Sequence, residues 1–389
     1  MADFSEEDFS RCEDIFRNAT GNTRTTTITE TAPLFTDALK RGEWDALLAL
    51  LLCQTPYLES IELLGQGHPD SRLVFTEQVL EKAAELQAQA KNDSTTTGGC
   101  SLSHLHSAST YYWDTERGMG LWSIEPFVRL KSMEKIHVNL LVIESYHQYD
   151  VTRMENNVKE LNINYGAIDG DRLIEFLPYF KSLEVIKYVD GGGSLGHAEF
   201  YPQKWGEAIV HLTGTLRMLD LAVSGGIALG NNGELVEALG PLVEFECLKE
   251  LSIDCDVLLG PAEQHRFIDL DATGSESDDD EPETWRLLEV FPSSLEKLSV
   301  YDCDDRFPEQ MIEVLLRKEE LVPMLEILTV RGNIMHQDIG LSFVEPCKAA
   351  GVELKILQFG MGTEPAVSPS SPAPGPPVII FGIPMGGNV

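Results

Sequence analysis

A six-residue pattern, apolar-x-x-apolar-x-apolar, recurs along the chain and constrains its fold more than any other feature. One copy carries little weight, because three large apolar residues at fixed places in six arise by chance in roughly one window in thirty. The spacing of the copies is more informative. From Met133 onward the successive steps are 25, 25, 33, 32, 47, 30 and 29 residues, near the period of proteins built from repeated strand and helix units. The nine copies are LESIEL from Leu58, MEKIHV from Met133, VKELNI from Val158, LEVIKY from Leu183, LRMLDL from Leu216, LKELSI from Leu248, LEKLSV from Leu295, LEILTV from Leu325 and LKILQF from Leu354.

Apolar residues at helical spacing precede many of these copies, and Gly or Pro separates the two parts at many of the joints. Examples are Trp44–Leu51, Arg172–Leu177, Glu234–Leu239 and Gln310–Leu316. Each unit is therefore predicted to form a helix, a turn and a short strand. Because such a unit cannot bury its apolar face alone, neighbouring units must stack. The sequence predicts an α/β fold, a leucine-rich-repeat solenoid with parallel strands on the concave face of an arc and helices on the convex face.

Alternation along a strand assigns the two faces of this predicted sheet. Positions one, four and six of each copy are apolar and are expected to point into the stack. The third, fifth and seventh positions are expected to face the open concavity, where they mix polar and apolar residues without a catalytic pattern. We therefore predict a concave face that binds a protein target. The candidate partner-binding residues are Asn162, Asn164, Lys187, Asp220, Ser252, Asp254, Tyr301 and Arg331.

The repeat domain is predicted to span residues 36–361, with two interruptions. The first is an irregular insert at about 92–125, inside a 75-residue gap between copies that leaves room for one or two degenerate repeats. The second is an acidic segment at about 271–284, which is too charged to pack and is predicted to be a disordered loop. Acids follow Ser275 and Ser277 in this loop, so these residues are candidate phosphorylation sites, with a merely solvated loop as the alternative.

The two ends of the chain are predicted to lie outside the repeats. Residues 1–35, rich in Thr and acids, are expected to form a partly disordered lead-in. Residues 362–389 are rich in proline and are expected to form a disordered tail. Near its end the tail carries Val378–Phe381, an apolar tetrapeptide that either docks on a partner or returns to the last repeat and caps its exposed core. We favour the second interpretation.

Acidic residues outnumber basic ones by 63 to 29, which gives a net charge of −34. This charge argues against nucleic acid and an anionic membrane as partners. A basic protein surface suits it better, and the alternative is that the charge only keeps an apolar array soluble. The N-terminus has no secretory signal pattern, and no run reaches the ~18 to 20 apolar residues of a membrane span. Seven cysteines without a CxxC pair fit a reducing compartment. We expect a cytoplasmic or nuclear monomer with no metal or cofactor.

One local motif is the basis of an alternative, enzymatic interpretation. Residues Phe267–Gly274 match the DxDxT pattern of haloacid-dehalogenase-like phosphatases, in which Asp269 would be the nucleophile and Asp271 the general acid. The same acids resemble a calcium-binding loop. That phosphatase fold needs a buried strand before the motif, but only two apolar residues precede it here, and the helices that flank a calcium loop are missing. Phosphatase-like or calcium-binding activity therefore remains the alternative to a non-catalytic function.

Four segments of the chain resemble a known family, the F-box and leucine-rich-repeat proteins of filamentous fungi. They are Gly42–Leu52 and Pro56–Leu63, similar to the region after the F-box, and Phe291–Leu298 and Cys347–Leu354, similar to later repeats. In that family an F-box binds the cullin-ligase adaptor, and the repeats present a target for ubiquitin transfer. The resemblance thus implies a substrate-recognition part of a ubiquitin ligase. The Leu-Pro-x-Glu start of an F-box is not found in residues 1–35, where the only proline is Pro33, so the residues themselves do not predict adaptor binding.

Overall fold

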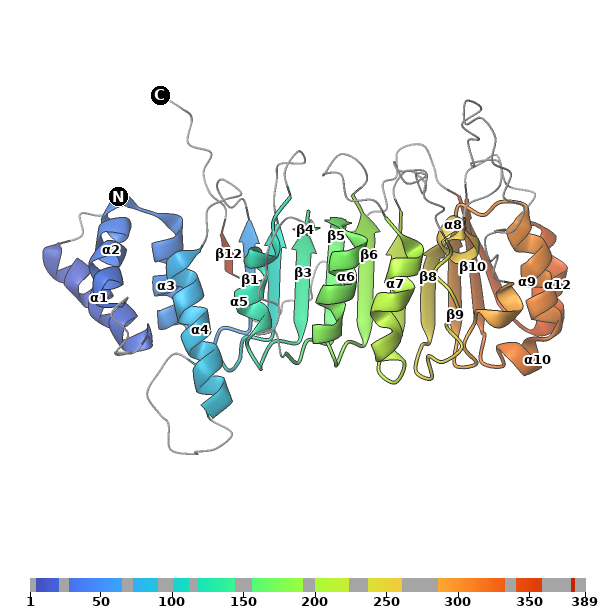
Figure 1. Cartoon of the computed structure of the whole chain (residues 1–389), viewed down its shortest axis with the longest axis horizontal. Helices are drawn as coiled ribbons and strands as arrows, with labels where there is room; N and C mark the ends of the chain where they lie inside the picture. The colour runs from blue at the N-terminus through green and yellow to red at the C-terminus, as the bar shows by residue number, and fades with distance from the viewer. Residues whose placement is uncertain are drawn as a thin grey trace, which may run out of the picture.

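The computed structural model describes residues 5–20, 28–64, 73–89, 101–111, 118–143, 156–191, 200–223, 237–260, 286–332, 341–358 and 379–381. In this part of the chain one parallel sheet contains eleven strands in the order β11-β10-β9-β8-β7-β6-β5-β3-β2-β1-β12, and β4 pairs with β5 beside that path. Except for β12, neighbouring strands on the path follow one another in the chain (Figure 1). The strands are β1 (Ser60–Leu64), β2 (Ser107–Tyr111), β3 (Lys135–Asn139), β4 (Val142–Ile143), β5 (Glu160–Ile168), β6 (Val185–Asp190), β7 (Met218–Ala222), β8 (Glu250–Asp254), β9 (Lys297–Tyr301), β10 (Ile327–Gly332), β11 (Glu353–Gln358) and β12 (Ile379–Phe381).

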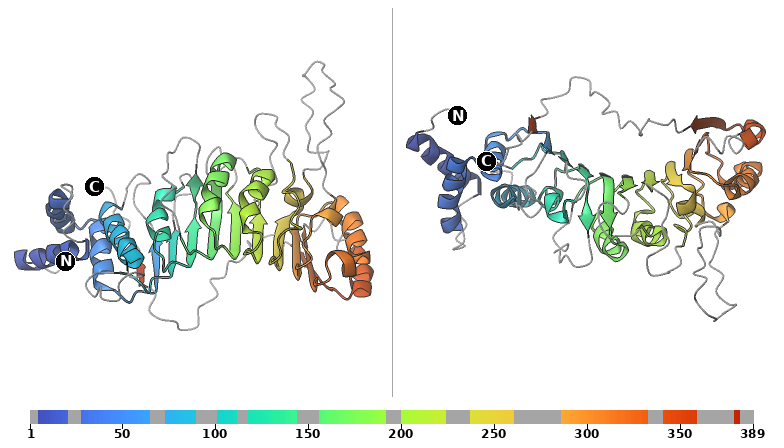
Figure 2. Two further views of the ribbon diagram at one scale, coloured as in Figure 1. Left: turned by 60° about the horizontal axis from the view of Figure 1, so that its bottom comes forward. Right: turned by 90° about the horizontal axis from the view of Figure 1, so that it is seen from above.

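Helices connect many of these strands and lie on one side of the sheet. Seen from above, the sheet bends into an arc, and α5, α6 and α7 lie on its outer side (Figure 2). Four longer helices, α1 to α4, lie at the β1 end (Figure 1). The α-helices are α1 (Glu6–Thr20), α2 (Ile28–Arg41), α3 (Trp44–Gln54), α4 (Val74–Gln89), α5 (Glu125–Val128), α6 (Gly170–Phe176), α7 (Pro202–Ile209), α8 (Cys255–Leu259), α9 (Arg306–Leu316), α10 (Lys318–Leu321) and α12 (Val344–Ala350), and the 3₁₀ turns are η1 (Leu121–Ser123), η3 (Leu177–Tyr179), η5 (Val210–Leu212) and η7 (Leu287–Glu289).

Burial alternates along the strands as the repeat pattern predicts. On β8, for example, Leu251 and Ile253 are buried and Ser252 between them is half-buried. Position one of the pattern is buried as well, at Leu248 and at its counterparts in neighbouring units. Each buried Leu or Ile of this kind contributes about 1.5 to 3 kcal/mol relative to an exposed one. Together these side chains form one continuous core along the stack.

Pairs of opposite charge connect neighbouring units at the edge of the sheet where the strands begin. The side chains at position two make three such pairs: Lys159 Nζ lies 2.7 Å from Glu134 Oε1, Arg217 Nε lies 3.3 Å from Glu184 Oε2, and Lys249 Nζ lies 2.6 Å from Glu296 Oε1. Exposed pairs of this kind contribute little to stability, because water and salt screen them. Their contribution is mainly to strand register, because a slip by one residue would break them and turn the apolar residues outward.

Eight of the nine hexapeptides lie side by side in a common register, as expected. The ninth prediction is wrong by three residues. Leu354 pairs with Leu328 and so takes position four of its unit, where we had assigned it position one. The physical reason is that helix α12 ends in Gly351 with φ of 68°, a left-handed cap that fixes where the last strand begins. The sequence favoured the other phase because Leu354, Leu357 and Phe359 match the pattern there, whereas the observed register places Gly351 at position one.

A tenth unit lies inside the insert that we expected to be irregular. Strand β2 pairs with β1 and β3 in the same register, and it places Leu105, Ala108 and Thr110 at positions one, four and six. These side chains are buried. The pattern missed them because alanine and threonine do not count as large apolar residues. The gap between Leu58 and Met133 thus contains a degenerate repeat, as the spacing allowed.

Two helices, α1 and α2, replace the partly disordered lead-in that we expected over residues 1–35. Phe16 of α1 stacks on Phe35 of α2 with ring centroids 4.0 Å apart, and Phe75 of α4 packs edge-on against both rings. These aromatic side chains belong to the same core as the repeats. The expectation failed because a few widely spaced aromatic residues are enough to bury a helix against a neighbour, although they give little apolar periodicity.

Two further expectations need correction. Residues 237–239, the described part of the helix predicted over Glu234–Leu239, are not helical, and the Leu239 amide donates to the Val257 carbonyl oxygen at 2.9 Å. In the tail, Ile379–Phe381 form strand β12 and pair with β1, the first strand of the sheet. We had expected this segment to be part of a disordered tail or to return to the last repeat, which lies at the opposite end. The rest of the tail lies outside the described residues.

Candidate protein-interaction surface

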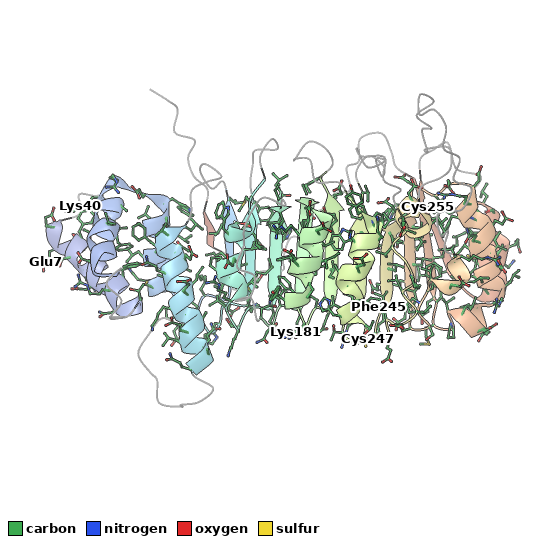
Figure 3. All side chains as sticks on the ribbon, viewed as in Figure 1. Glu7, Lys40, Lys181, Phe245, Cys247 and Cys255 are labelled. Atoms are coloured by element: carbon green, nitrogen blue, oxygen red, sulfur yellow. The ribbon has the colours of Figure 1, made fainter. Side chains whose placement is uncertain are left out.

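The strand face opposite the helices is the candidate site, and we call it the concave face. It consists of the third, fifth and seventh hexapeptide positions of β1 to β3 and β5 to β11. The strands run from the lower edge of the sheet, near Lys181 and Cys247, to the upper edge, near Cys255 (Figure 3). Position three therefore lies low on this face and position seven high. Seven of the eight predicted partner-binding residues are half-buried, the burial expected of an open sheet surface; Asp254 is the exception.

Four of the predicted residues gather on β7 to β10. The Arg331 guanidinium carbon lies 4.9 Å from the centre of the Tyr301 ring, and Arg331 Nη1 donates to Tyr301 Oη at 3.4 Å. The Tyr301 hydroxyl also bonds the Asp220 carboxylate, and Ser252 bonds Tyr301. Burial raises the pKa of Asp220, while the charges of Lys187 and Arg331 and the tyrosine bond lower it. We call Asp220, Ser252, Tyr301 and Arg331 the tyrosine cluster; its own bonds hold its side chains in place.

A second cluster includes two residues that sequence reasoning missed. His137 Nε2 lies 3.0 Å from Asn164 Nδ2, and His137 Nδ1 lies 3.5 Å from Tyr111 Oη. One neutral tautomer fits both contacts, since Nε2 accepts from the amide while Nδ1 carries the proton. Burial lowers the pKa of His137 and so favours this neutral ring. The signal for His137 was present, because it occupies position five of MEKIHV; Tyr111 follows the degenerate repeat and had no pattern to reveal it.

Asn162 lies beside this histidine cluster but does not complete it. It pairs in register with His137 on one side and with Lys187 on the other. Its side-chain oxygen is buried and has no hydrogen-bond partner among the described residues. A buried acceptor without a partner costs free energy, so hydrogen bonding at this point of the face is incomplete among the described residues.

Next to the histidine cluster, and sharing Asp220 with the tyrosine cluster, lies a region that we call the central patch, formed by three cross-strand pairs of β6 and β7. Val185 pairs with Met218 and Val189 pairs with Ala222, with Lys187 opposite Asp220 between them. All six side chains are half-buried. Methionine is enriched in the buried core of protein interfaces, whereas lysine and aspartate are depleted there, so the apolar pairs are the part of this patch expected to contribute most to binding.

The charge of the concave face differs from that of the whole chain. Its positions hold five basic and six acidic residues, whereas the chain carries a net charge of −34. Several of these charges pair with each other, as Lys297 Nζ does with Glu250 Oε1 at 2.6 Å. The acidic excess therefore lies elsewhere, and attraction of a strongly basic partner is not a property of this face. The charged residues of the face are Lys135, Lys187, Lys297, Arg331, Lys355, Glu62, Glu160, Asp220, Glu250, Asp254 and Glu353.

Asp254 is the predicted site residue that the structure places differently. Its side chain is only 8% exposed and accepts a hydrogen bond from the Val223 amide, so it ties β8 to the end of β7 and is not presented to solvent. The candidate phosphorylation sites Ser275 and Ser277 lie outside the described residues. So does the Asp269 and Asp271 motif.

Among the described residues, His, Cys, Asp and Glu side chains do not gather in groups of three or more that could hold a metal ion. In the same part of the chain, no helix combines the length and the apolar character needed to cross a membrane. Comparisons with protein-family models, with curated proteins and with solved structures found no match.

Proposed function

We propose that this chain is a leucine-rich-repeat solenoid that binds another protein on its concave face and performs no chemistry of its own. One observation carries the proposal. Ten successive units place alternate side chains of their strands on the face opposite the helices, where nearly all remain partly accessible. Such a surface is long, preformed and varied in chemistry, which suits the recognition of a folded partner or an extended segment.

The central patch is the proposed anchor of this interface. Binding energy in protein interfaces concentrates in a few central residues surrounded by contacts that exclude water. Met218 and Val185 supply the apolar area, and Lys187, which pairs in register with Asp220, supplies a charge. The two polar clusters on either side are held by their own hydrogen bonds, so little side-chain freedom is lost when a partner binds.

Affinity purification from the source cells, followed by mass spectrometry, tests this proposal. The double variant Met218→Ala with Lys187→Ala is expected to recover at least about tenfold less of the partner than the parent chain, since truncating central residues costs on the order of 1 to 2 kcal/mol each. The matched control is Leu316→Ala on α9, which removes a side chain that is 78% exposed and not on the concave face. Equal recovery by the double variant and the parent, or loss in the control alone, would contradict the proposal.

We propose further that the partner is a target presented for ubiquitin transfer, as the family resemblance implies. Helices α1 and α2 support this part, because they precede the repeats, where proteins of that family carry the region that binds the ligase adaptor. Mixing the purified chain with the cullin-ligase adaptor and measuring co-elution decides it. Co-elution is the expected result. If the adaptor does not co-elute, the ligase role is contradicted. Binding of a protein on the concave face is then still tested by the affinity purification described above.

A further inference from the structure

Among the described strands, the outer edge of β1 is where the sheet path departs from chain order. From β11 to β1 the path follows the chain, with β4 beside it, but β1 pairs with β12 from the C-terminal tail. The pairing is parallel, and it sets Ile379 opposite Ile61, Ile380 opposite Glu62 and Phe381 opposite Leu63. Ile379 and Phe381 thus fall at register positions four and six, where the repeats place apolar residues. Figure 1 shows β12 beside β1, at the opposite end of the sheet from β10.

The edge itself explains why a strand is taken up there. Without β12, the outer side of β1 would present unpaired backbone N–H and C=O groups to solvent, which is a template for pairing with any extended chain. The side chains of Ile61 and Leu63 are buried, and helices α1 to α4 continue the core beyond them, so the open requirement at this edge is for backbone pairing. An added strand satisfies these backbone groups, as the register of β12 with β1 does.

The contact with the tail is short and costly to close. Only three residues pair, and short isolated pairings are marginal in water. The path from β11 to β12 crosses ten strand spacings, on the order of 48 Å at ~4.8 Å each. A flexible linker the length of residues 359–378 has a relaxed span of only about 25 Å, although six prolines favour extension in this one. Closing the pairing across this distance costs chain entropy, which lowers the effective concentration of Ile379–Phe381 at the edge.

We propose that the outer edge of β1 is a strand-acceptor site and that Ile379–Phe381 is its displaceable occupant within the same molecule. The site takes an extended apolar segment in parallel orientation. Backbone pairing supplies the affinity, and apolar residues at alternate positions supply the selectivity, as in other cases of strand addition. This site is separate from the concave face and does not depend on the proposed function.

A peptide spanning residues 377–383, labelled for fluorescence anisotropy, tests the proposal on the full chain. In the variant Ile379→Pro with Ile380→Pro, proline replaces two adjacent residues, so whichever of the two amides faces β1 can no longer donate to it. The tail of this variant therefore cannot pair with the edge. It is expected to bind the peptide at least about tenfold more tightly than the parent, because an occupied site lowers the apparent affinity by the fraction that is free. The matched control, Gly386→Pro with Gly387→Pro, carries two prolines beyond the strand and should behave like the parent. A peptide with the same Ile-to-Pro changes should bind neither protein.

Three results would overturn the proposal: equal peptide binding by the parent and the variant, no binding by the variant, or a dimeric mass of the parent in sedimentation, which would assign the strand to a second copy. If the proline variant does not fold, a chain with residues 378–381 all replaced by glycine takes its place. That chain keeps every residue of the repeats, and the same anisotropy titration applies to it with the same expected difference.

Discussion

Replacing Ile186 with alanine is expected to lower the free energy of unfolding by about 3 kcal/mol, whereas Val185→Ala on the same strand should lower it by about 1 kcal/mol or less. The two residues are adjacent on β6, and both are β-branched and aliphatic. Ile186 is 1% exposed, and its register partners Leu161 and Leu219 on the neighbouring strands are also buried. Truncating Ile186 leaves a cavity between neighbouring units. Truncating Val185 removes only partly exposed methyl groups from the concave face.

Urea unfolding followed by circular dichroism measures both changes, provided that the slope with urea concentration is unchanged between variants. The comparison is a direct test of the face assignment, since β propensity and backbone pairing are nearly the same at the two positions. Similar losses for the two variants, or a larger loss for Val185→Ala, would mean that the burial along β6 is assigned to the wrong side.

The strands were predictable because their signal is local and repeated. Apolar residues at positions one, four and six had to recur wherever a unit stacks on its neighbour, and Leu248, Leu251 and Ile253 display all three. The exceptions have physical reasons. The strand that holds Ala108 and Thr110 sits between two strong units, so it tolerates weak residues. At β11, where the stack ends, Ile356 is 41% exposed, and the pattern there no longer reports burial.

The contacts between distant segments could not be predicted from periodicity. Nothing in the sequence near Val378–Phe381 indicates which end of the sheet the tail reaches, because both ends expose an unpaired edge before it binds. The stacking of Phe16 on Phe35 likewise depends on how two helices cross. These features follow from the three-dimensional course of the chain.

The candidate surface was predictable in position and only partly in detail. Counting along each strand placed Asp220, Tyr301 and Arg331 on one face, and the structure brings them together. Counting could not show that Asp254, at the seventh position of its unit, turns from that face to bond the Val223 amide. Position seven lies where each strand ends, so the chain beyond it decides where the side chain goes.

The position of Asp254 has a consequence for stability. Burial, and then the nearby charges of Asp302, Asp256 and Asp220, raise its pKa from 3.8 to about 7, although the hydrogen bond from Val223 acts in the opposite direction. Among its acidic neighbours, Asp256 is itself paired, with Arg306 Nη2 at 3.0 Å. A carboxyl group with a raised pKa in the folded state favours folding when protonated. Its contribution is complete below about pH 4 and is lost as the pH rises through about 7.

Asp254→Asn is therefore expected to stabilise the protein at pH 8 by up to about 4 kcal/mol. The pKa of Asp254 is raised by about three units on folding, and each unit corresponds to ~1.36 kcal/mol. The asparagine oxygen can still accept from the Val223 amide, so the loss of charge is isolated from the loss of the bond. Thermal or urea unfolding between pH 4 and pH 8 should show the variant and the parent nearly equal at pH 4 and diverging as the pH rises. Asp254→Ala, which also removes the acceptor, should gain less than the asparagine variant. Parallel stability profiles for the parent and Asp254→Asn would show that the carboxyl ionises in the folded protein near its ordinary pKa, and that burial at the end of β8 does not govern its charge.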